Sequence, residues 1–285
     1  MNQIKNTIIL LRFPFSIFLL PITLFSLVLI RPAADYRLFL VLAIWHLLVF
    51  PSCNGYNSYH DRDEGSIGGL ASPPKPSRLL LHFSNLMDAT AILLSLFLNG
   101  IYAMFVLGFI IASRLYSNRN VRFKKFPIIG FLVVFFFQGA WVFYSNFFAL
   151  SPETALLNPT IIFSGIASSF FIATIYPLTQ IYQHEADRKD GVKTLSMLLG
   201  TKGTFIFSAL MFSFSTLFIY LVFKNDAIHN FWMFNLVMLP STLYFLFWAT
   251  RSFKNSLHIN FKNTMVMLIL SSCLNNLFFL ILIFK

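Results

Sequence analysis

Long apolar stretches alternate with short polar segments along the whole chain. A helix that crosses about 30 Å of hydrocarbon needs about 20 such residues. Nine stretches meet this requirement, and they are continuously apolar rather than alternating, which favours helices over a membrane barrel. The predicted spans are residues 7–30, 38–56, 79–98, 101–116, 127–150, 160–182, 205–223, 231–248 and 265–284. The pattern therefore predicts an all-α integral membrane protein, with nine transmembrane helices in one bundle and a single domain over residues 1–285.

Composition supports this class, because 57% of the residues are hydrophobic and only 11% are charged. The first span is longer than the apolar core of a secretory signal and is interrupted by Arg12, so we expect it to be retained as a helix. Cys53 and Cys273 are the only cysteines, and both lie in apolar surroundings. A disulfide framework or a zinc site is therefore not expected.

The basic residues indicate an orientation. With the N-terminus in the cytoplasm, 17 of the 21 Lys and Arg residues fall at cytoplasmic ends, and only Arg31, Arg37, Lys224 and Lys285 fall outside. This distribution obeys the positive-inside rule. The net charge of +11 then reflects topology and attraction to anionic lipid, so nucleic-acid binding is not needed to explain it. We expect a multi-pass protein of a bacterial inner membrane, with its functional face in the cytoplasm.

Six of the ten acidic residues fall in two short segments, PSCNGYNSYHDRDEG at 51–65 and PLTQIYQHEADRKDG at 177–191. A shift of 126 residues aligns Asp61 with Asp187 and several further related positions. Both segments follow helices that run toward the cytoplasm in the predicted topology, so a repeat would be parallel, about an axis along the membrane normal.

Each segment places an amide and two acids at i, i+4 and i+7, which puts them on one helical face. These residues are Asn57, Asp61 and Glu64 in the first segment and Gln183, Asp187 and Asp190 in the second. We expect each helix to end at the glycine that follows, Gly65 or Gly191. Two facing acidic clusters repel each other unless a cation lies between them. Hard oxygen ligands suit Mg²⁺, which completes its shell with water or substrate phosphate, so a phosphorylated ligand is the natural partner.

A basic loop, SRLYSNRNVRFKK at 113–125, lies between the two acidic segments in the sequence. Its basic side chains can neutralise a diphosphate from the other side of the site. The alternative is an ordinary solvated loop, because the positive-inside rule already predicts basic residues there.

At these residues the chain resembles the UbiA superfamily of intramembrane prenyltransferases, over essentially its whole length. Three family motifs occur in the correct order. The matching residues are Asn57, Asp61 and Asp63 after the second span, Tyr116, Ser117, Arg122 and Lys124 in the basic loop, and Asp187, Arg188, Gly191, Thr194 and Leu195 after the sixth span. Ser58, Gly65 and Gln183 stand where the family usually has aspartate, which leaves the number of Mg²⁺ ions and their exact ligands open.

The resemblance implies Mg²⁺-dependent transfer of a prenyl group from a polyprenyl diphosphate to a lipophilic, aromatic acceptor, as in the biosynthesis of quinones and related lipids. It implies that Asn57, Asp61 and Asp187 are catalytic. The implied metal ligands are Asn57, Asp61, Asp63, Glu64, Gln183, Asp187 and Asp190. The implied phosphate-binding residues are Arg122 and Lys124, with Arg62, Arg188 and Lys193 as further candidates.

Two polar residues within the third predicted span need a separate explanation. Asn85 and Asp88 are spaced i, i+3, and an acid inside a membrane is a functional candidate. They can position the acceptor or remove its proton, or they can form a packing contact. Arg12 can either anchor the first helix or approach the acceptor.

Two other functions remain open at this point. An intramembrane terpene cyclase would use the same scaffold, with the prenyl tail as its own acceptor. A divalent-cation transporter is the other alternative, although a transporter should place ionisable residues at mid-membrane, whereas this chain places its acids at one face. The acceptor, the tail length and the oligomeric state do not follow from the sequence.

Overall fold

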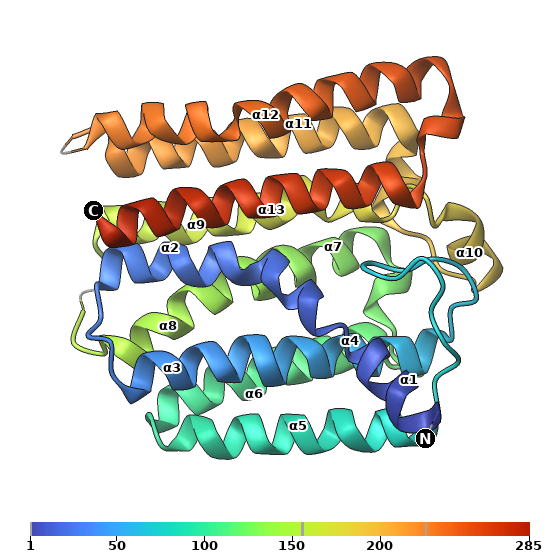
Figure 1. Cartoon of the computed structure of the whole chain (residues 1–285), viewed down its shortest axis with the longest axis horizontal. Helices are drawn as coiled ribbons and strands as arrows, with labels where there is room; N and C mark the ends of the chain where they lie inside the picture. The colour runs from blue at the N-terminus through green and yellow to red at the C-terminus, as the bar shows by residue number, and fades with distance from the viewer. Residues whose placement is uncertain (1, 155–156, 226) are drawn as a thin grey trace.

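The computed structural model describes residues 2–154, 157–225 and 227–285. The helices run side by side along one axis and form a bundle (Figure 1). Within the described residues, nine helical spans are long and apolar enough to cross a membrane, so the predicted all-α fold and its nine spans are confirmed. The observed spans are Gln3–Ile30, Tyr36–Asp61, Arg78–Leu96, Gly100–Ser117, Pro127–Leu150, Pro159–Thr179, Leu195–Phe223, Ile228–Lys254 and Phe261–Phe284.

Several spans consist of more than one helical segment. The first comprises α1 (Asn2–Leu11), η1 (Phe13–Leu19) and α2 (Leu20–Ile30), and the second α3 (Tyr36–Ala43), η2 (Ile44–Val49) and α4 (Phe50–Asp61). The third and fourth are α5 (Arg78–Leu96) and α6 (Gly100–Ser117), followed by the short η3 (Phe123–Lys125). The fifth comprises α7 (Pro127–Phe135), η4 (Phe136–Trp141) and α8 (Val142–Leu150), and the sixth α9 (Pro159–Ile175) and η5 (Pro177–Thr179). After α10 (His184–Lys189) come α11 (Leu195–Phe223), α12 (Ile228–Lys254), η6 (Ser256–His258) and α13 (Phe261–Phe284).

The break in the first span occurs at Arg12, whose backbone is left-handed with φ 50°. Pro14 follows two residues later and has no N–H to donate into a regular helix. The second span instead continues through the wide π-helical turn η2, whereas the fifth is kinked within η4 at Gly139, whose φ of −96° and ψ of −105° are not helical. Gly139 packs so closely on α9 that a Cβ there would lie 2.3 Å from Ser169 Cα.

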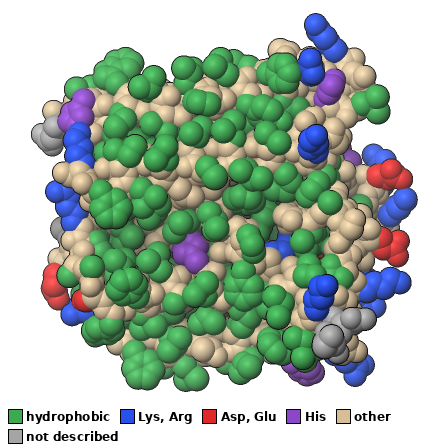
Figure 2. All heavy atoms as spheres, in the orientation of Figure 1, with side chains coloured by type: hydrophobic (Ala, Val, Ile, Leu, Met, Phe, Trp, Pro, Cys, Tyr) green, Lys and Arg blue, Asp and Glu red, His purple; other side chains and the backbone are tan. Residues whose placement is uncertain are grey.

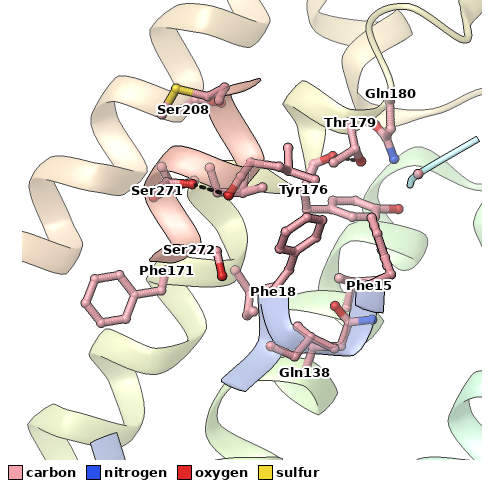
Figure 3. Close-up of a pocket in the computed structure, with 18 of the residues that line it drawn as sticks. Phe15, Phe18, Gln138, Phe171, Tyr176, Thr179, Gln180, Ser208, Ser271 and Ser272 are labelled. Carbon is pink, nitrogen blue, oxygen red and sulfur yellow. Dashed lines mark hydrogen bonds between the residues drawn. The ribbon is translucent and has the colours of Figure 1, made fainter. Parts of the chain in front are cut away.

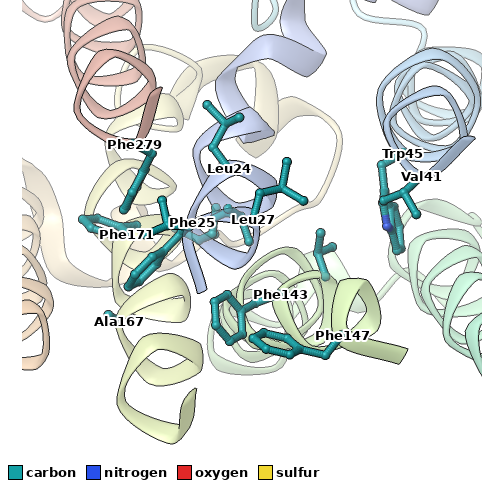
Figure 4. Close-up of a cluster of buried hydrophobic side chains, with 14 of the residues drawn as sticks. Leu24, Phe25, Leu27, Val41, Trp45, Phe143, Phe147, Ala167, Phe171 and Phe279 are labelled. Atoms are coloured by element: carbon teal, nitrogen blue, oxygen red, sulfur yellow. The ribbon is translucent and has the colours of Figure 1, made fainter. Parts of the chain in front are cut away.

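α9 is the central helix of the bundle. In its most apolar segment 67% of the residues are buried, against 22% for α11 and α12. The main core lies where α2, α8, α9 and α13 meet, and Phe25 there stacks on Phe279 with ring centroids 4.6 Å apart (Figure 4). Aromatic pairs of this kind contribute about 0.5–1.5 kcal/mol each beyond area burial. Figure 2 shows hydrophobic side chains covering the middle of the molecule and charged side chains gathered at its two ends, as a bilayer requires.

The loop between α4 and α5 and the helix α10 lie at the same end of the bundle, which we call the α10 end (Figure 1). The two acidic segments therefore meet at one end of the molecule. The helices within both segments differ from the prediction.

The prediction that the second span continues as a helix to Gly65 is wrong. α4 ends at Asp61, because Arg62 takes a left-handed conformation with φ 53° and its N–H bonds to Ser58 O at 3.1 Å. This closes the helix one turn early. Glu64 is thus beyond the helix and does not share a helical face with Asn57 and Asp61.

The prediction of one continuous helix through the second segment is also wrong. α9 ends at Ile175, and Pro177, which lacks an N–H, follows in η5. The chain then turns and forms the separate short helix α10, with Gln183 before it and Asp190 after it. The expected glycine cap is confirmed, because Gly191 has φ 69° directly after Asp190.

Candidate active site

A cavity of about 520 Å³ opens near the α10 end and extends between the helices. Figure 3 shows side chains around it from several elements, among them Phe18, Gln138, Phe171, Tyr176 and Ser271. Its lining is polar toward the acidic segments and largely apolar along α2, α9 and the start of α4. We call the polar part the acidic mouth. The side chains that form it are Asn57, Asp61, Asp63, Gln183, Asp187, Lys124 and Arg12.

The last turn of α4 supplies the first group of ligands. Asn57 Nδ2 donates to Asp61 Oδ2 at 2.8 Å and to Ser117 Oγ on α6 at 3.2 Å. Asp61 forms ion pairs with Lys124 and, at 3.5 Å, with Arg122. The Asp61 side chain is only 5% exposed, so these basic partners balance its charge where water is scarce.

The left-handed Arg62 turns the chain so that the next side chain, Asp63, also lines the cavity. Burial, together with the charge of Asp61, raises the pKa of Asp63 to about 6. Arg62 and Glu64 on either side are exposed, and Arg62 lies 6.0 Å from the Tyr59 ring. The early end of α4 thus selects Asp63 rather than Glu64 for the cavity.

The second group comes from the turn before α10 and from α10 itself. Gln183 Nε2 donates to Ser66 O at 3.0 Å, which ties α10 to the loop after α4 and leaves the amide oxygen of Gln183 as an acceptor. Asp187 lies one helical turn further and lines the same cavity. Burial is the main cause that raises the pKa of Asp187 to about 7. Lys124 lowers this pKa, and the negative charges of Asp63, Asp61 and Asp190 raise it further.

The raised pKa values of Asp63 and Asp187 reflect burial first and the negative charges of neighbouring carboxyl groups second, so a bound cation would stabilise the ionised form of both. Within the described residues, no three His, Cys, Asp or Glu side chains are placed to hold a metal by themselves. The oxygen atoms of two amides and three carboxylates do suit Mg²⁺, which keeps several waters and shares its shell with substrate phosphate. The donor set therefore fits a magnesium ion that binds together with a phosphorylated ligand.

The basic loop reaches the acidic mouth through Lys124. Arg122 is buried and left-handed, with φ 53°, and it pairs with both Asp61 and Asp190. Asp190 Oδ1 also forms an ion pair with Arg119 Nη2 at 3.5 Å, and Asp190 does not line the cavity. Arg122 thus links the two acidic segments behind the cavity, whereas Lys124 faces into it.

Four other predicted site residues lie elsewhere. Arg188 and Lys193 line a separate, smaller pocket beside the start of α11. Asn85 is exposed on the outer face of α5. Asp88 is buried but does not line the cavity, and it pairs with Arg114 of α6 and accepts a hydrogen bond from Ser52 of α4. The structure does not bring Arg62, Glu64, Asn85, Asp88, Arg188 or Lys193 into the acidic mouth.

Arg12 is the mouth residue whose contacts no motif indicated. Its terminal nitrogens donate to Gly68 O at 2.9 Å and to Asn54 O at 3.2 Å, and its Nε has no partner. Arg12 therefore ties the first span to the loop after α4 and to α4 itself, and it also lines the cavity, while its approach to an acceptor stays a prediction. The sequence did show a charged residue, Arg12, inside an apolar span, which marks it as a candidate. The backbone carbonyls that its side chain contacts could not be predicted.

Two comparisons with known proteins found matches, and both lead to the same family. A family model described as the UbiA prenyltransferase family matches residues 18–281. A UbiA homolog from Archaeoglobus fulgidus, solved bound to DMAPP and Mg²⁺, has 20% identity and a TM-score of 0.74, with coverage of 98% of this chain and 99% of that chain.

The same archaeal homolog bound to GPP and Mg²⁺ gives 17% identity and a TM-score of 0.66, over 96% of this chain and 99% of that chain. A structure of a digeranylgeranylglyceryl phosphate synthase gives 18% identity and a TM-score of 0.62, over 100% and 98% of the two chains. At these identities the likeness concerns the fold. No curated protein sequence matches the chain.

Proposed function

The chain belongs to the UbiA prenyltransferase family, and from this premise we propose that it transfers a prenyl group from a polyprenyl diphosphate to a lipophilic aromatic acceptor at the acidic mouth. It is an integral multi-pass membrane protein and a prenyltransferase. Mg²⁺ is the proposed cofactor, and quinone or related lipid biosynthesis the proposed context. The positive-inside pattern supports a bacterial inner membrane with the mouth facing the cytoplasm.

One observation carries the proposal. The end of α4 and the region of α10 bring Asn57, Asp61, Asp63, Gln183 and Asp187 to one cavity, and this cavity continues between apolar helices. A prenyl diphosphate has the same two parts, a phosphorylated head that needs Mg²⁺ and an apolar tail that needs shelter. The archaeal homologs of this fold were solved with DMAPP or GPP and Mg²⁺.

The residues of the mouth have separate roles in this proposal. Asn57, Asp61, Asp63, Gln183 and Asp187 would hold Mg²⁺, which supplies positive charge to the departing diphosphate. Lys124 binds diphosphate oxygen from the other side, where negative charge develops in the transition state. The bond between C1 and the diphosphate oxygen breaks, and the diphosphate leaves with the electron pair. The allylic carbon then bonds to the acceptor, which loses one proton.

The apolar walls and the aromatic side chains near the mouth shelter the allylic cation. Tyr176 and Tyr116 both line the cavity, with their hydroxyl oxygens 2.8 Å apart. An aromatic face stabilises a nearby cation by about 0.5–2 kcal/mol. The exclusion of water by this lining prevents simple hydrolysis of the cation.

The proposal is tested with purified protein in lipid nanodiscs, given labelled prenyl diphosphates of several lengths, phenolic acceptors, and either Mg²⁺ or EDTA. We expect a prenylated acceptor only with Mg²⁺, and we expect Asp61→Ala and Asp187→Ala each to lose most of the turnover. Full activity in either variant contradicts the assigned site. A hydrocarbon product formed without acceptor would instead establish terpene cyclisation.

A further inference from the structure

The wall of the cavity formed by α11, α12 and α13 mixes polar and apolar side chains, although it lies within membrane spans. Its apolar members are Ala209, Phe212, Met238, Phe245, Leu246, Met267 and Leu268. We call its polar members the polar wall, and they are Ser208, Ser213, Ser241, Thr242, Ser271, Ser272 and Asn275. At about 1.5 Å per residue, Ser271 lies about 15 Å along α13 from its start at the α10 end. Among the described residues, these three helices contribute no charged side chain to the cavity.

This wall differs from the opposite side of the cavity. α2, α4, α6 and α9 contribute apolar side chains such as Ile22, Phe50, Phe109 and Ile172. A prenyl tail needs only an apolar lining, so the apolar side suits the tail. Figure 3 shows Ser208, Ser271 and Ser272 across the cavity from Phe15 and Gln138. Polar side chains at this depth are costly in a membrane unless they have a ligand or a partner.

The donors of the polar wall are mostly directed into the protein. Ser241 and Thr242 both donate to Met238 O, at 2.8 and 3.1 Å, and Ser271 donates to Leu268 O at 3.2 Å. Ser272 donates to Ile17 O at 3.2 Å. A hydroxyl has one donor proton and two acceptor lone pairs, so these four oxygens offer mainly acceptors to the cavity.

Two buried oxygens of the polar wall have no partner, Ser208 Oγ and Asn275 Oδ1. The amide nitrogen of Asn275 is already used, because Nδ2 donates to Ser271 O at 2.9 Å. Its free oxygen can therefore be satisfied only by a hydrogen-bond donor. A molecule complementary to this wall is lipophilic, uncharged where it meets the wall, and carries hydroxyl groups.

We propose that the polar wall binds the prenyl acceptor, and that Ser208 and Asn275 select it through hydroxyl groups that donate to their free oxygens. This inference rests on the proposed function, since it assigns the second substrate to one wall of the same cavity. The prenyl tail then occupies the apolar side, and the acceptor approaches the acidic mouth from the polar wall.

The test is equilibrium binding of two labelled probes to the protein in nanodiscs, 1,4-dihydroxynaphthalene kept reduced with ascorbate, and 1,4-dimethoxynaphthalene. The two share a ring, but only the first donates hydrogen bonds. We expect the parent to bind the first roughly tenfold more tightly. Asn275→Leu and Ser208→Ala should each weaken its binding roughly threefold to tenfold and leave the dimethoxy probe unaffected.

Matched controls separate this role from general destabilisation. Ser215 is also a buried serine of α11 with an unpartnered hydroxyl, and Asn235 of α12 makes the same bond to the carbonyl four residues earlier as Asn275 does. Neither lines the cavity. Ser215→Ala and Asn235→Leu should leave the affinity for both probes unchanged. Circular dichroism and the thermal unfolding temperature check that each variant is folded, and geranyl diphosphate binding with Mg²⁺ should be unchanged.

Several results would overturn the assignment. The dihydroxy probe could fail to bind, or each substitution could weaken the binding of both probes equally. Ser208→Ala and Asn275→Leu could also leave the binding of both probes unaltered. If these two variants instead bind geranyl diphosphate more weakly, the prenyl tail lies on this wall. If the proposed prenyl transfer itself is wrong, the result is different. The protein would then not consume geranyl diphosphate with Mg²⁺, regardless of how the two naphthalene probes bind.

Discussion

Lys124 is the basic side chain that both pairs with Asp61 and faces the cavity. If it binds diphosphate, Lys124→Met should raise the KM for the prenyl diphosphate by at least about tenfold, because a charge-assisted hydrogen bond contributes about 1.5–3 kcal/mol. Initial-rate kinetics with varied prenyl diphosphate measure this. Lys125→Met is the matched control, since Lys125 lies against the Phe126 ring and not in the cavity. Equal effects of the two substitutions would remove Lys124 from the site.

Asp187 should show opposite effects on stability and on activity. The raised pKa of about 7 means that the folded protein disfavours its negative charge. Without metal, this carboxylate therefore makes the fold less stable as the pH rises from about 4 through 7. Asp187→Asn removes that penalty, so the variant should unfold at a higher temperature than the parent at pH 8 in EDTA, and at a similar temperature at pH 4.

The same variant should lose turnover by at least about 100-fold, because it lacks a charge needed where the diphosphate leaves. Thermal unfolding and prenyl-transfer assays on one preparation measure both effects. Glu185→Gln is the control, since Glu185 is exposed on α10 and pairs with Lys189. A variant that is less stable than the parent at pH 8 would show that the buried charge of Asp187 is not the cause.

At the scale of elements, α4 is held against α5 and α6 by buried polar contacts. Asp88 of α5 pairs with Arg114 of α6, whose guanidinium lies 3.8 Å from the centre of the Tyr56 ring on α4. α4 and α5 approach so closely that a Cβ on Gly55 would lie 2.6 Å from Ser84 Oγ. This packing fixes the last turn of α4, which carries Asn57 and Asp61.

Removal of one partner of this pair leaves a buried charge without compensation. Asp88→Leu and Arg114→Leu should each lower the free energy of unfolding by about 3–5 kcal/mol, whereas the double variant should lose less than the sum. A double-mutant cycle of unfolding in detergent measures the coupling. Additive losses would mean that the two side chains do not interact.

The elements themselves were largely predictable from the sequence, because a membrane span requires only a long apolar run. The ends of the spans were not. Arg62 ends α4 by taking a left-handed conformation that arginine rarely adopts, and Pro177 separates α10 from α9. No local pattern distinguishes these breaks from Pro51, which the second span accommodates next to the wide turn η2.

The sequence predicted which types of residue form the site, but it did not predict in which direction each side chain points. Asp61 and Asp187 line one cavity, as their aligned positions in the two segments indicated, whereas Glu64 and Asp190 of the same spacing do not. Arg188 and Lys193 face another pocket because α10 is a separate helix, and Asn85 is exposed whereas Asp88, three residues later, is buried. Neighbouring residues of one helix can thus face lipid or protein, and only the packed bundle determines which.

At the scale of the whole molecule, the orientation in the membrane can be measured. Lys189 is exposed at the α10 end, and Arg37 is exposed at the start of α3 at the other end. In a background with Cys53→Ser and Cys273→Ser, a membrane-impermeant maleimide should label Arg37→Cys in intact cells and Lys189→Cys only in inverted vesicles. The reverse pattern would place the acidic mouth outside the cell.

The cavity has a charged end and an apolar body, and this arrangement determines where each product goes. Inorganic diphosphate is insoluble in hydrocarbon and departs into water, while the alkylated compound is insoluble in water and diffuses away among lipid tails. The two products are thereby partitioned into different phases as soon as they form. Recombination would require both to return to the same cavity at once, so the reverse reaction becomes slow once the products have separated.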